Sequence, residues 1–398
     1  MNASDFPRLR LKPKADARAV RHGAPWVYSD DMVWDRRSKA VAPGSIAVLE
    51  DSAREPLALA AVHPDARVAC RILTRDVEAR IDAAWFAERF SDAVTLRDRL
   101  FDAPYYRLVH AEGDGLPGLI VDRFGDTLVV QPNAAWLETR LDDLVSALVD
   151  ATGAKHILKN AASRARALEG LDFESKVLLG TPPDRVNVPM NGATYVADLA
   201  EGQKTGLFYD QRPNHAFAAS LAQETEVLDV FSHVGGFALA CLAGGARSAL
   251  AVDGSAQALA LANDGARETG VSERFQTLQS DAFDALASLH DQGRQFDIVI
   301  CDPPAFAPSK AALTPGLRAY ERIARLATPL VRRNGVLILC SCSHAATPEK
   351  FRNASLRGIG RAGGTPALLR TGFAGPDHPV HPALSATGYL KTLAFRIL

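Results

Sequence analysis

At residues 227–237 the chain reads VLDVFSHVGGF, an apolar run followed by a turn with two adjacent glycines. The run predicts a buried strand, and the paired glycines let the backbone behind it come close to a ligand. The turn lacks the G-x-G-x-x-G spacing of a nicotinamide or flavin site. The turn therefore favours a ligand other than a nicotinamide or flavin dinucleotide. A dinucleotide-dependent oxidoreductase is kept as the alternative function.

The rest of the C-terminal half repeats the same unit of a buried strand and a helix. Further apolar strands are expected at 248–252, 274–278, 296–301 and 335–340, with helical stretches between them. This alternation predicts an α/β fold with a parallel sheet and helices on both faces, a Rossmann-like domain over residues 199–398. Ligands in such sheets bind at the carboxyl ends of the strands.

An acidic residue follows three of these strands, namely Asp253, Asp281 and Asp302. An acid after the second strand suits the ribose hydroxyls of an adenosine, and one after the third can accept a hydrogen bond from the adenine amino group. Each aspartate taken alone could simply cap a helix. The series at successive strand ends favours the binding of an adenosine-containing ligand.

Residues 302–306 read DPPAF directly after a buried strand. Two prolines at this point cannot continue the strand ladder, so they predict a rigid loop over the site, with a plain turn as the alternative. Methyltransferases that act on bases or amides carry this D-P-P or N-P-P element, whose acid or amide bonds to the target heterocycle. The element indicates methyl transfer with S-adenosylmethionine as the donor.

The last buried strand leads into residues 341–344, SCSH, which bring the thiol of Cys342 to the same edge of the sheet. The flanking hydroxyls and His344 set this cysteine apart as a candidate nucleophile. The other cysteines are expected to be small buried side chains: Cys70, Cys241, Cys301 and Cys340.

A thiol has a specific use in methyl transfer to a pyrimidine. C5 of the ring is too weak a nucleophile to attack the sulfonium unaided, and addition of a thiolate at C6 makes C5 reactive. The thiolate leaves after a base has removed the C5 proton. Asp302 could support this chemistry by bonding to N3 and the exocyclic amine of a cytosine.

The N-terminal half has a different pattern. Short apolar runs at 44–49, 57–62 and 68–73, separated by turn-forming residues, predict a small β-rich domain over residues 1–76. Residues 82–100 change to helical spacing and predict a connecting helix.

Residues 77–198 are expected to form a compact α+β domain around this helix. Its predicted elements are strands at 106–109, 119–122 and 127–131, a helix at 136–151, and strands at 156–159 and 193–197.

The 398-residue chain has a net charge of −1, which gives the whole protein no electrostatic footprint for nucleic acid. Residues 1–25 nevertheless carry six basic and two acidic side chains, which could be a solvated face or a phosphate-binding surface. There is no apolar stretch of membrane-spanning length, no secretory signal and no cysteine spacing typical of zinc. We expect a cytoplasmic protein without a membrane partner, a disulfide framework or a metal.

Taken together, the motifs make the chain similar to the bacterial 23S rRNA cytosine-C5 methyltransferase family. That family combines an N-terminal PUA domain, a central EEHEE domain and a Rossmann-like catalytic domain. The resemblance covers nearly the whole chain and depends on residues 106–123, 201–206, 209–212, 231–237, 302–310 and 341–344.

The resemblance implies a role for each matching residue. Cys342 would be the nucleophile, Asp302 would contact the target base, and an RNA, first of all 23S rRNA, would be the substrate; a homodimer would be compatible with it. The S-adenosylmethionine site would comprise Tyr209, Gln211, Arg212, Phe231, Ser232, Gly235, Asp253, Ser255, Asp281 and Ala282.

Three alternatives stay open besides the dinucleotide-dependent oxidoreductase. Relatives that methylate a guanine nitrogen share the D-Q-R and D-P-P elements but lack the cysteine of the final motif, so Cys342 favours cytosine. A methyltransferase with a substrate other than RNA and an RNA-binding module without activity are the other two.

Overall fold

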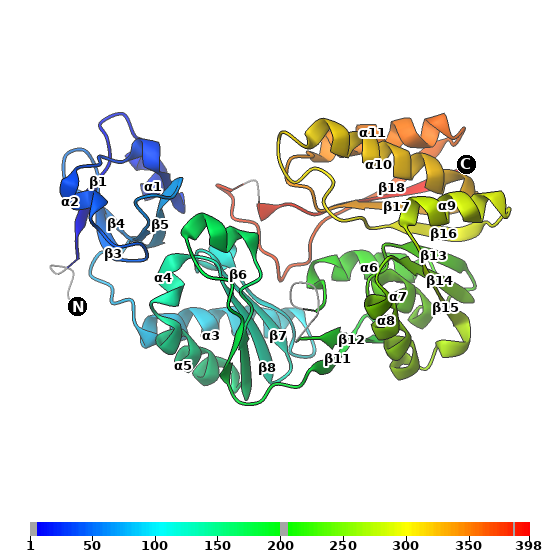
Figure 1. Cartoon of the computed structure of the whole chain (residues 1–398), viewed down its shortest axis with the longest axis horizontal. Coiled ribbons are helices and arrows are strands. Elements are labelled where there is room, and N and C mark those ends of the chain that lie inside the picture. Colours follow the sequence, from blue (N-terminus) through cyan, green and yellow to red (C-terminus); the bar gives the residue numbers. More distant parts are fainter. Residues whose placement is uncertain (1–5, 200–205, 385–386) are drawn as a thin grey trace. The chain divides into compact units, whose positions relative to one another are not determined.

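The computed structural model describes residues 6–199, 206–384 and 387–398. By their contacts, residues group into two compact units, Met1–Pro183 with Asp377–Leu384 and Asp184–Pro376 with Ser385–Leu398 (Figure 1). Residues 201–205 of the motif at 201–206 lie outside the described residues. No helix in the described ranges has the length and apolar character needed to cross a membrane.

The first unit begins with the expected β-rich domain. Its sheet has the strand order β1-β3-β4-β5-β2, and β1 and β3 run parallel. The apolar runs predict three of these strands well because most of their side chains are buried. The elements are β1 (Arg8–Arg10), α1 (Ala17–Arg21), β2 (Trp26–Tyr28), α2 (Arg36–Lys39), β3 (Ile46–Glu50), β4 (Pro56–Val62) and β5 (Val68–Thr74).

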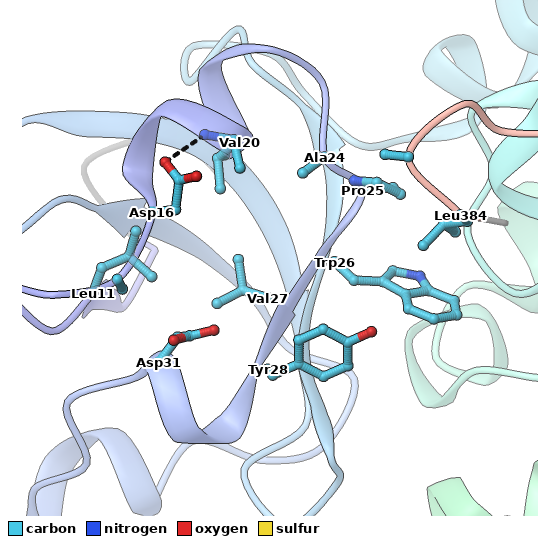
Figure 2. A pocket seen from close by; sticks show the side chains of 13 residues that line it. Leu11, Asp16, Val20, Ala24, Pro25, Trp26, Val27, Tyr28, Asp31 and Leu384 are labelled. Carbon is cyan, nitrogen blue, oxygen red and sulfur yellow. Dashed lines mark hydrogen bonds between the residues drawn. The ribbon is translucent and has the colours of Figure 1, made fainter. Parts of the chain in front are cut away.

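A cavity of about 250 Å³ lies in this domain between α1, β2 and the segment that ends at Leu384 (Figure 2). Its lining is mostly apolar, with the rings of Trp26 and Tyr28 on one side. Asp16 and Asp31 also line it, which makes the cavity a poor site for a phosphate.

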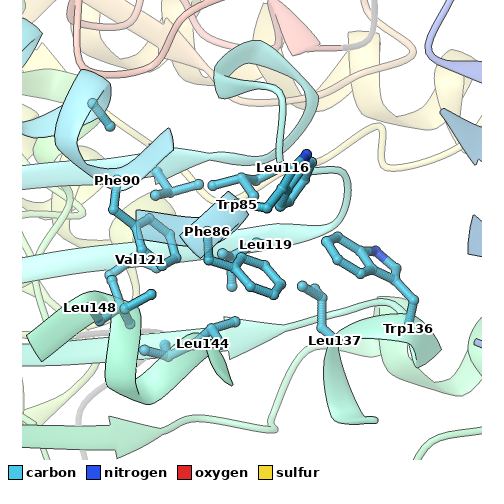
Figure 3. Packing of buried hydrophobic residues seen from close by; sticks show 14 of the residues in the cluster. Trp85, Phe86, Phe90, Leu116, Leu119, Val121, Trp136, Leu137, Leu144 and Leu148 are labelled. Atoms are coloured by element: carbon cyan, nitrogen blue, oxygen red, sulfur yellow. The ribbon is translucent and has the colours of Figure 1, made fainter. Parts of the chain in front are cut away.

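The second part of the first unit is a five-stranded sheet with the order β10-β9-β8-β7-β6, packed against helices. The long helix α3 (Ala83–Leu100) is capped by Asp82 and buries Trp85, Phe86 and Phe90. Figure 3 shows these rings beside Trp136, whose ring is stacked on that of Phe86 at a centroid distance of 5.6 Å. The other elements are β6 (Tyr105–His110), β7 (Leu119–Phe124), β8 (Thr127–Pro132), α4 (Ala135–Glu138), α5 (Leu141–Thr152), β9 (His156–Lys159) and β10 (Lys176–Leu179).

One predicted strand belongs elsewhere. Residues 193–197 do form a strand, β12 (Ala193–Asp198), but it pairs with β11 (Arg185–Met190) in a separate two-stranded sheet within the second unit. The fifth strand of the first unit's sheet is the edge strand β10, which reads KVLL. Its residues are exposed or half-buried, and Val177 is 50% exposed, so the short apolar run does not alternate with polar residues. The domain boundaries at 76/77 and 198/199 stay predictions.

The second unit contains the expected Rossmann-like sheet, and this confirms the predicted α/β class. Its order is β15-β14-β13-β16-β17-β19-β18. The first five strands are parallel, and β19 pairs antiparallel with both β17 and β18. The strands are β13 (Glu226–Val230), β14 (Ser248–Asp253), β15 (Phe275–Gln279), β16 (Phe296–Cys301), β17 (Val331–Ser341), β18 (Pro366–Gly372) and β19 (Lys391–Ile397).

Helices cover both faces of this sheet. Figure 1 shows α9, α10 and α11 over one face and α6, α7 and α8 over the other. The bounds are α6 (Arg212–Ser220), α7 (Gly236–Ala243), α8 (Ala256–Thr269), α9 (Ala282–Asp291), α10 (Leu313–Ala327) and α11 (Pro348–Arg361).

The register of the parallel strands brings their carboxyl ends to one edge. Val230 is paired with Val252 on one side and with Cys301 on the other, and Cys301 is paired with Leu339. The residues that follow these strands therefore share one edge of the sheet. All of the predicted catalytic and cofactor residues belong to the second unit.

Candidate active site

The turn after β13 is tightly built around its glycines. Gly235 has a φ of 80°, which favours glycine, and it precedes α7 directly. A Cβ on Gly236 would lie 2.8 Å from atoms of the His215 ring. Phe231 and His233 also have positive φ angles, 64° and 49°. Such strain costs about 1–3 kcal/mol per residue and is typical of functional turns.

Two buried polar atoms at this turn have no hydrogen-bond partner among the described residues: Oδ1 of Asp229 and Oγ of Ser232. The other oxygen of Asp229 accepts a hydrogen bond from the amide of Ala238 at 2.9 Å. Burial raises the pKa of Asp229 to about 7. Unsatisfied buried polar atoms are costly, so they fit a site that is completed by a polar ligand.

Asp253, at the end of β14, connects two turns. One carboxylate oxygen accepts from the amide of His233 at 2.9 Å, and the other accepts from the amide of Ser255 at 2.8 Å. Ser255 in turn caps α8 by accepting from Ala258. The carboxylate therefore fixes the β13 turn and the β14 turn relative to each other.

Asp281 and Ala282 follow β15 at the start of α9. Asp281 is exposed, and one of its oxygens accepts from the amides of Phe283 and Asp284 at 2.8 and 3.2 Å. Asp281 thus caps α9, which was the alternative to ligand binding for this residue in the sequence analysis. Ala282 is buried behind it.

Tyr209, Gln211 and Arg212 lie at the start of α6. The Tyr209 ring is buried, and the Arg212 guanidinium lies 5.4 Å from the centre of that ring. The side-chain amide of Gln211 donates to Oδ2 of Asp302 at 2.9 Å and accepts from Asn214 at 2.7 Å. Gln211 is therefore in contact with the predicted base-binding carboxylate, a link that the sequence did not indicate.

The loop at Asp302 is anchored to the sheet and to aromatic rings. The Asp302 amide donates to the carbonyl of Val230 at 3.1 Å. The Phe306 ring packs near Phe231 and Tyr320, with centroid distances of 6.4 and 5.1 Å. The prolines are thus part of an ordered loop beside the β13 turn, as the sequence predicts.

Cys342 lies on the loop after β17, and it is the one cysteine of the five that is partly exposed. Cys70, Cys241, Cys301 and Cys340 are buried, as expected. Burial raises the pKa of each of these four thiols. The cysteine that carries the predicted chemistry is therefore also the accessible one.

The Cys342 loop is held by buried hydroxyls. Ser341 donates to the Tyr320 hydroxyl at 2.9 Å, and the hydroxyls of Tyr320 and Ser343 are 2.7 Å apart. Ser343 also accepts from the amide of Ala307, so it joins this loop to the loop that starts at Asp302. Tyr320 is far from both loops in the sequence, and no motif pointed to it.

A family model described as S-adenosylmethionine-dependent methyltransferase matches residues 128–395. The chain belongs to this family. A second model, for a PUA-like domain, matches residues 9–75 of the methyltransferase. The predicted use of S-adenosylmethionine is confirmed, and the family favours this interpretation over a dinucleotide-dependent oxidoreductase.

Full-length relatives are similar to the methyltransferase. Ribosomal RNA large subunit methyltransferase I of Alteromonas mediterranea is 33% identical over 391 residues, which cover 97% of this chain and 98% of the relative. A ribosomal RNA large subunit methyltransferase of Deinococcus radiodurans is 33% identical over 405 residues, with 98% of each chain covered. A structure from Streptococcus mutans, described as a SAM-dependent methyltransferase, shares the fold with a TM-score of 0.81 at 20% identity, covering 98% of this chain and all of that one.

Proposed function

We propose that this methyltransferase forms 5-methylcytosine in large-subunit ribosomal RNA, with Cys342 as the nucleophile. The observation that carries the proposal is the partly exposed Cys342 on a loop that is hydrogen-bonded through Ser343 to the Asp302 loop. The names of the relatives, ribosomal RNA large subunit methyltransferases, support the substrate class.

The cofactor would be held at the carboxyl ends of β13, β14 and β15 and at the start of α6. S-adenosylmethionine supplies an electrophilic methyl group on its sulfonium. Oδ1 of Asp229 and Oγ of Ser232, which have no hydrogen-bond partner in the described part of the chain, support a polar ligand at this edge. The proposed contacts are Tyr209, Gln211, Arg212, Phe231, Ser232, Gly235, Asp253, Ser255, Asp281 and Ala282.

Asp302 would orient and polarise the base. Its carboxylate accepts from Gln211, which leaves the acid fixed in direction before a substrate binds. A carboxyl group in this position can bond to N3 and the exocyclic amine of cytosine and stabilise the charge that develops on the ring. Pre-organisation of this kind is how polar groups lower an activation barrier.

Cys342 would act by addition and elimination. The thiolate would form a bond to C6, and the electron pair would move to C5. C5 would then take the methyl group while the bond between that methyl and the sulfonium sulfur breaks, which leaves the thioether S-adenosylhomocysteine. A base then removes the C5 proton, the C5–C6 double bond returns and the C6–S bond breaks, so the thiolate is regenerated.

We also propose a function for each part of the chain. Residues 1–76 would bind RNA, residues 77–198 would form the central domain, and residues 199–398 would form the catalytic domain. The match to a PUA-like domain supports the first assignment. Among the basic residues near the start, Arg8 and Arg21 form ion pairs with Glu50 and Asp51. Exposed Lys14 and Arg18 are the better candidates for phosphate contacts.

Nucleoside analysis after methylation of a large-subunit rRNA transcript tests the proposal. We expect 5-methylcytidine from the wild-type protein and from Cys241→Ala, a control that removes a buried cysteine. Cys342→Ser should give no product while it still binds S-adenosylmethionine. Methylguanosine as the product, or methylation retained in Cys342→Ser, would contradict the proposal.

A further inference from the structure

Lys391 is a buried lysine beside the Cys342 loop. It lies on β19 and is paired across the sheet with Ser341 of β17. Its ammonium donates to the carbonyl oxygens of Ser343 and Ala346 at 2.6 and 3.0 Å, and the residue is only 3% exposed. The side chain therefore ties both ends of the loop that carries Cys342.

A buried ammonium needs more compensation than these two neutral carbonyls give. The ion pairs found among the described residues include none with Lys391, so no carboxylate there lies within 4 Å of it. Burial lowers the pKa of Lys391 to about 8, and the charge on Cys342 raises it. A thiolate on Cys342 would supply the missing negative charge, because this cysteine belongs to the loop whose carbonyls the ammonium holds.

Other titratable groups belong to the elements that contact the Cys342 loop. Tyr320 on α10 has a pKa raised by burial and also by the charge on Cys342, so it acts as a neutral hydroxyl. Tyr389 donates to Asp210, and its ring lies 5.6 Å from that of His344. Asp302 is an acid. Among these groups, Lys391 is the one whose ordinary state at neutral pH is a cation.

We infer that Lys391 is a positioning residue for Cys342. The ammonium of Lys391 stabilises the Cys342 thiolate and fixes the loop at 341–346. This inference rests on the proposed role of Cys342 as the nucleophile. It gives a physical reason why the accessible cysteine would be ionised at neutral pH, because the thiolate and not the thiol is the attacking species. Above the pKa of Lys391 the ammonium loses its proton, and this support for the thiolate is lost.

Alkylation of the full-length protein by iodoacetamide, followed by peptide mass spectrometry, tests the inference without any methylation assay. Thiolate sulfur displaces iodide, so the rate at Cys342 reports the thiolate fraction, while the four buried cysteines serve as internal controls. For the wild-type protein we expect a half-maximal rate below the pH of about 8.5 that is typical of a free thiol. A half-maximal rate at or above that pH would overturn the inference.

Two substitutions separate charge from hydrogen bonding. Lys391→Gln keeps amide donors for the two carbonyls but removes the charge, and we expect the alkylation rate at pH 7 to fall by about tenfold, the effect of one pKa unit. Lys391→Arg keeps the charge and should retain a rate close to that of the wild type. Equal rates for the wild type and Lys391→Gln would overturn the inference.

A variant that no longer binds S-adenosylmethionine in calorimetry is counted as unfolded and left out. If both variants are unfolded, the dependence of the wild-type alkylation rate on pH alone decides whether the inference holds. The outcome is also distinguishable from failure of the proposed function. If Cys342→Ser still methylates RNA, the nucleophile assignment fails even where the alkylation data show that Lys391 stabilises the thiolate.

Discussion

The side chain of Gln211 donates a hydrogen bond to the carboxylate of Asp302 at 2.9 Å, although the two residues are 91 positions apart in the sequence. Gln211 is almost fully buried and is itself held by Asn214. The contact joins the start of α6 to the loop after β16. A residue expected to touch the cofactor thus also sets the direction of the acid proposed to bind the target base.

Gln211→Glu should therefore impair methyl transfer. The substitution places a second carboxylate against Asp302, replaces an attractive bond by repulsion and favours protonation of one of the two acids. Hydrogen bonds to charged groups contribute about 1.5–3 kcal/mol, so we expect a fall of roughly 10- to 100-fold in the single-turnover rate. Gln276→Glu, on the exposed side of β15, is the matched control. An unchanged rate in Gln211→Glu would show that the contact has no catalytic importance.

Asp229 should make the stability of the protein without cofactor depend on pH. Burial raises the pKa of its carboxyl group to about 7, above the value of about 4 in an unfolded chain. The folded state therefore binds the proton more tightly, and the free energy of unfolding should fall as pH rises from about 4 to about 7. Asp229→Asn removes this ionisation. In urea titrations at pH 5.5 and 8, the free energy of unfolding should therefore fall less between the two pH values for the variant than for the wild type. Equal losses for both proteins would refute the assignment.

Gly236→Ala should destabilise the turn before α7. The added Cβ would lie 2.8 Å from the His215 ring, which is buried and cannot move freely. Overpacking of this kind costs about 1–3 kcal/mol, and we expect a lower midpoint of urea unfolding together with weaker binding of S-adenosylmethionine. Gly360→Ala, in α11 with open space around its Cβ, should be neutral or slightly stabilising. Similar behaviour of the two variants would argue against the tight packing of this turn.

Tyr320→Phe should loosen the Cys342 loop. The change removes the hydroxyl that bonds to Ser341 and Ser343 and leaves two buried serine hydroxyls short of a partner. The expected loss is about 1–3 kcal/mol in the free energy of unfolding, with a lower methylation rate at saturating cofactor. Tyr28→Phe, at an exposed tyrosine of the first unit, is the control for stability. A Tyr320→Phe protein as stable as the wild type would contradict this account of the loop.

Much of the catalytic fold could be predicted because four of the five strands of its parallel sheet have mostly buried side chains. β13, β14, β16 and the second half of β17 therefore give largely apolar runs, and the turns after them carry the polar residues. The edge strand β15 reads FQTLQ and has a single buried residue, Phe275, so its apolar signal is weaker. β18 was not predicted, since two leucines on this edge strand, Leu368 and Leu369, are exposed and mask any alternation. β10 was missed for a similar reason.

The site could be predicted only as far as local motifs extend. Asp253, Asp302 and Cys342 follow apolar strands, and this local signal identifies them. Lys391 and Tyr320 reach the Cys342 loop through tertiary packing, across 48 and 23 residues from Ser343, so no spacing rule could reveal them. Asp281 illustrates the opposite case, because its carboxylate caps α9 whether or not it also binds a ligand.

The most direct test of the account is covalent trapping of Cys342 on RNA that contains 5-fluorocytidine. Fluorine at C5 cannot be removed as a proton, so the elimination that frees the thiolate is blocked after methyl transfer. With S-adenosylmethionine, the wild-type protein should form a complex with this RNA that survives denaturing electrophoresis and maps to Cys342, and Cys342→Ser should form none. Methylation of ordinary RNA without any trapped complex, or a complex of equal yield with Cys342→Ser, would contradict the proposed mechanism.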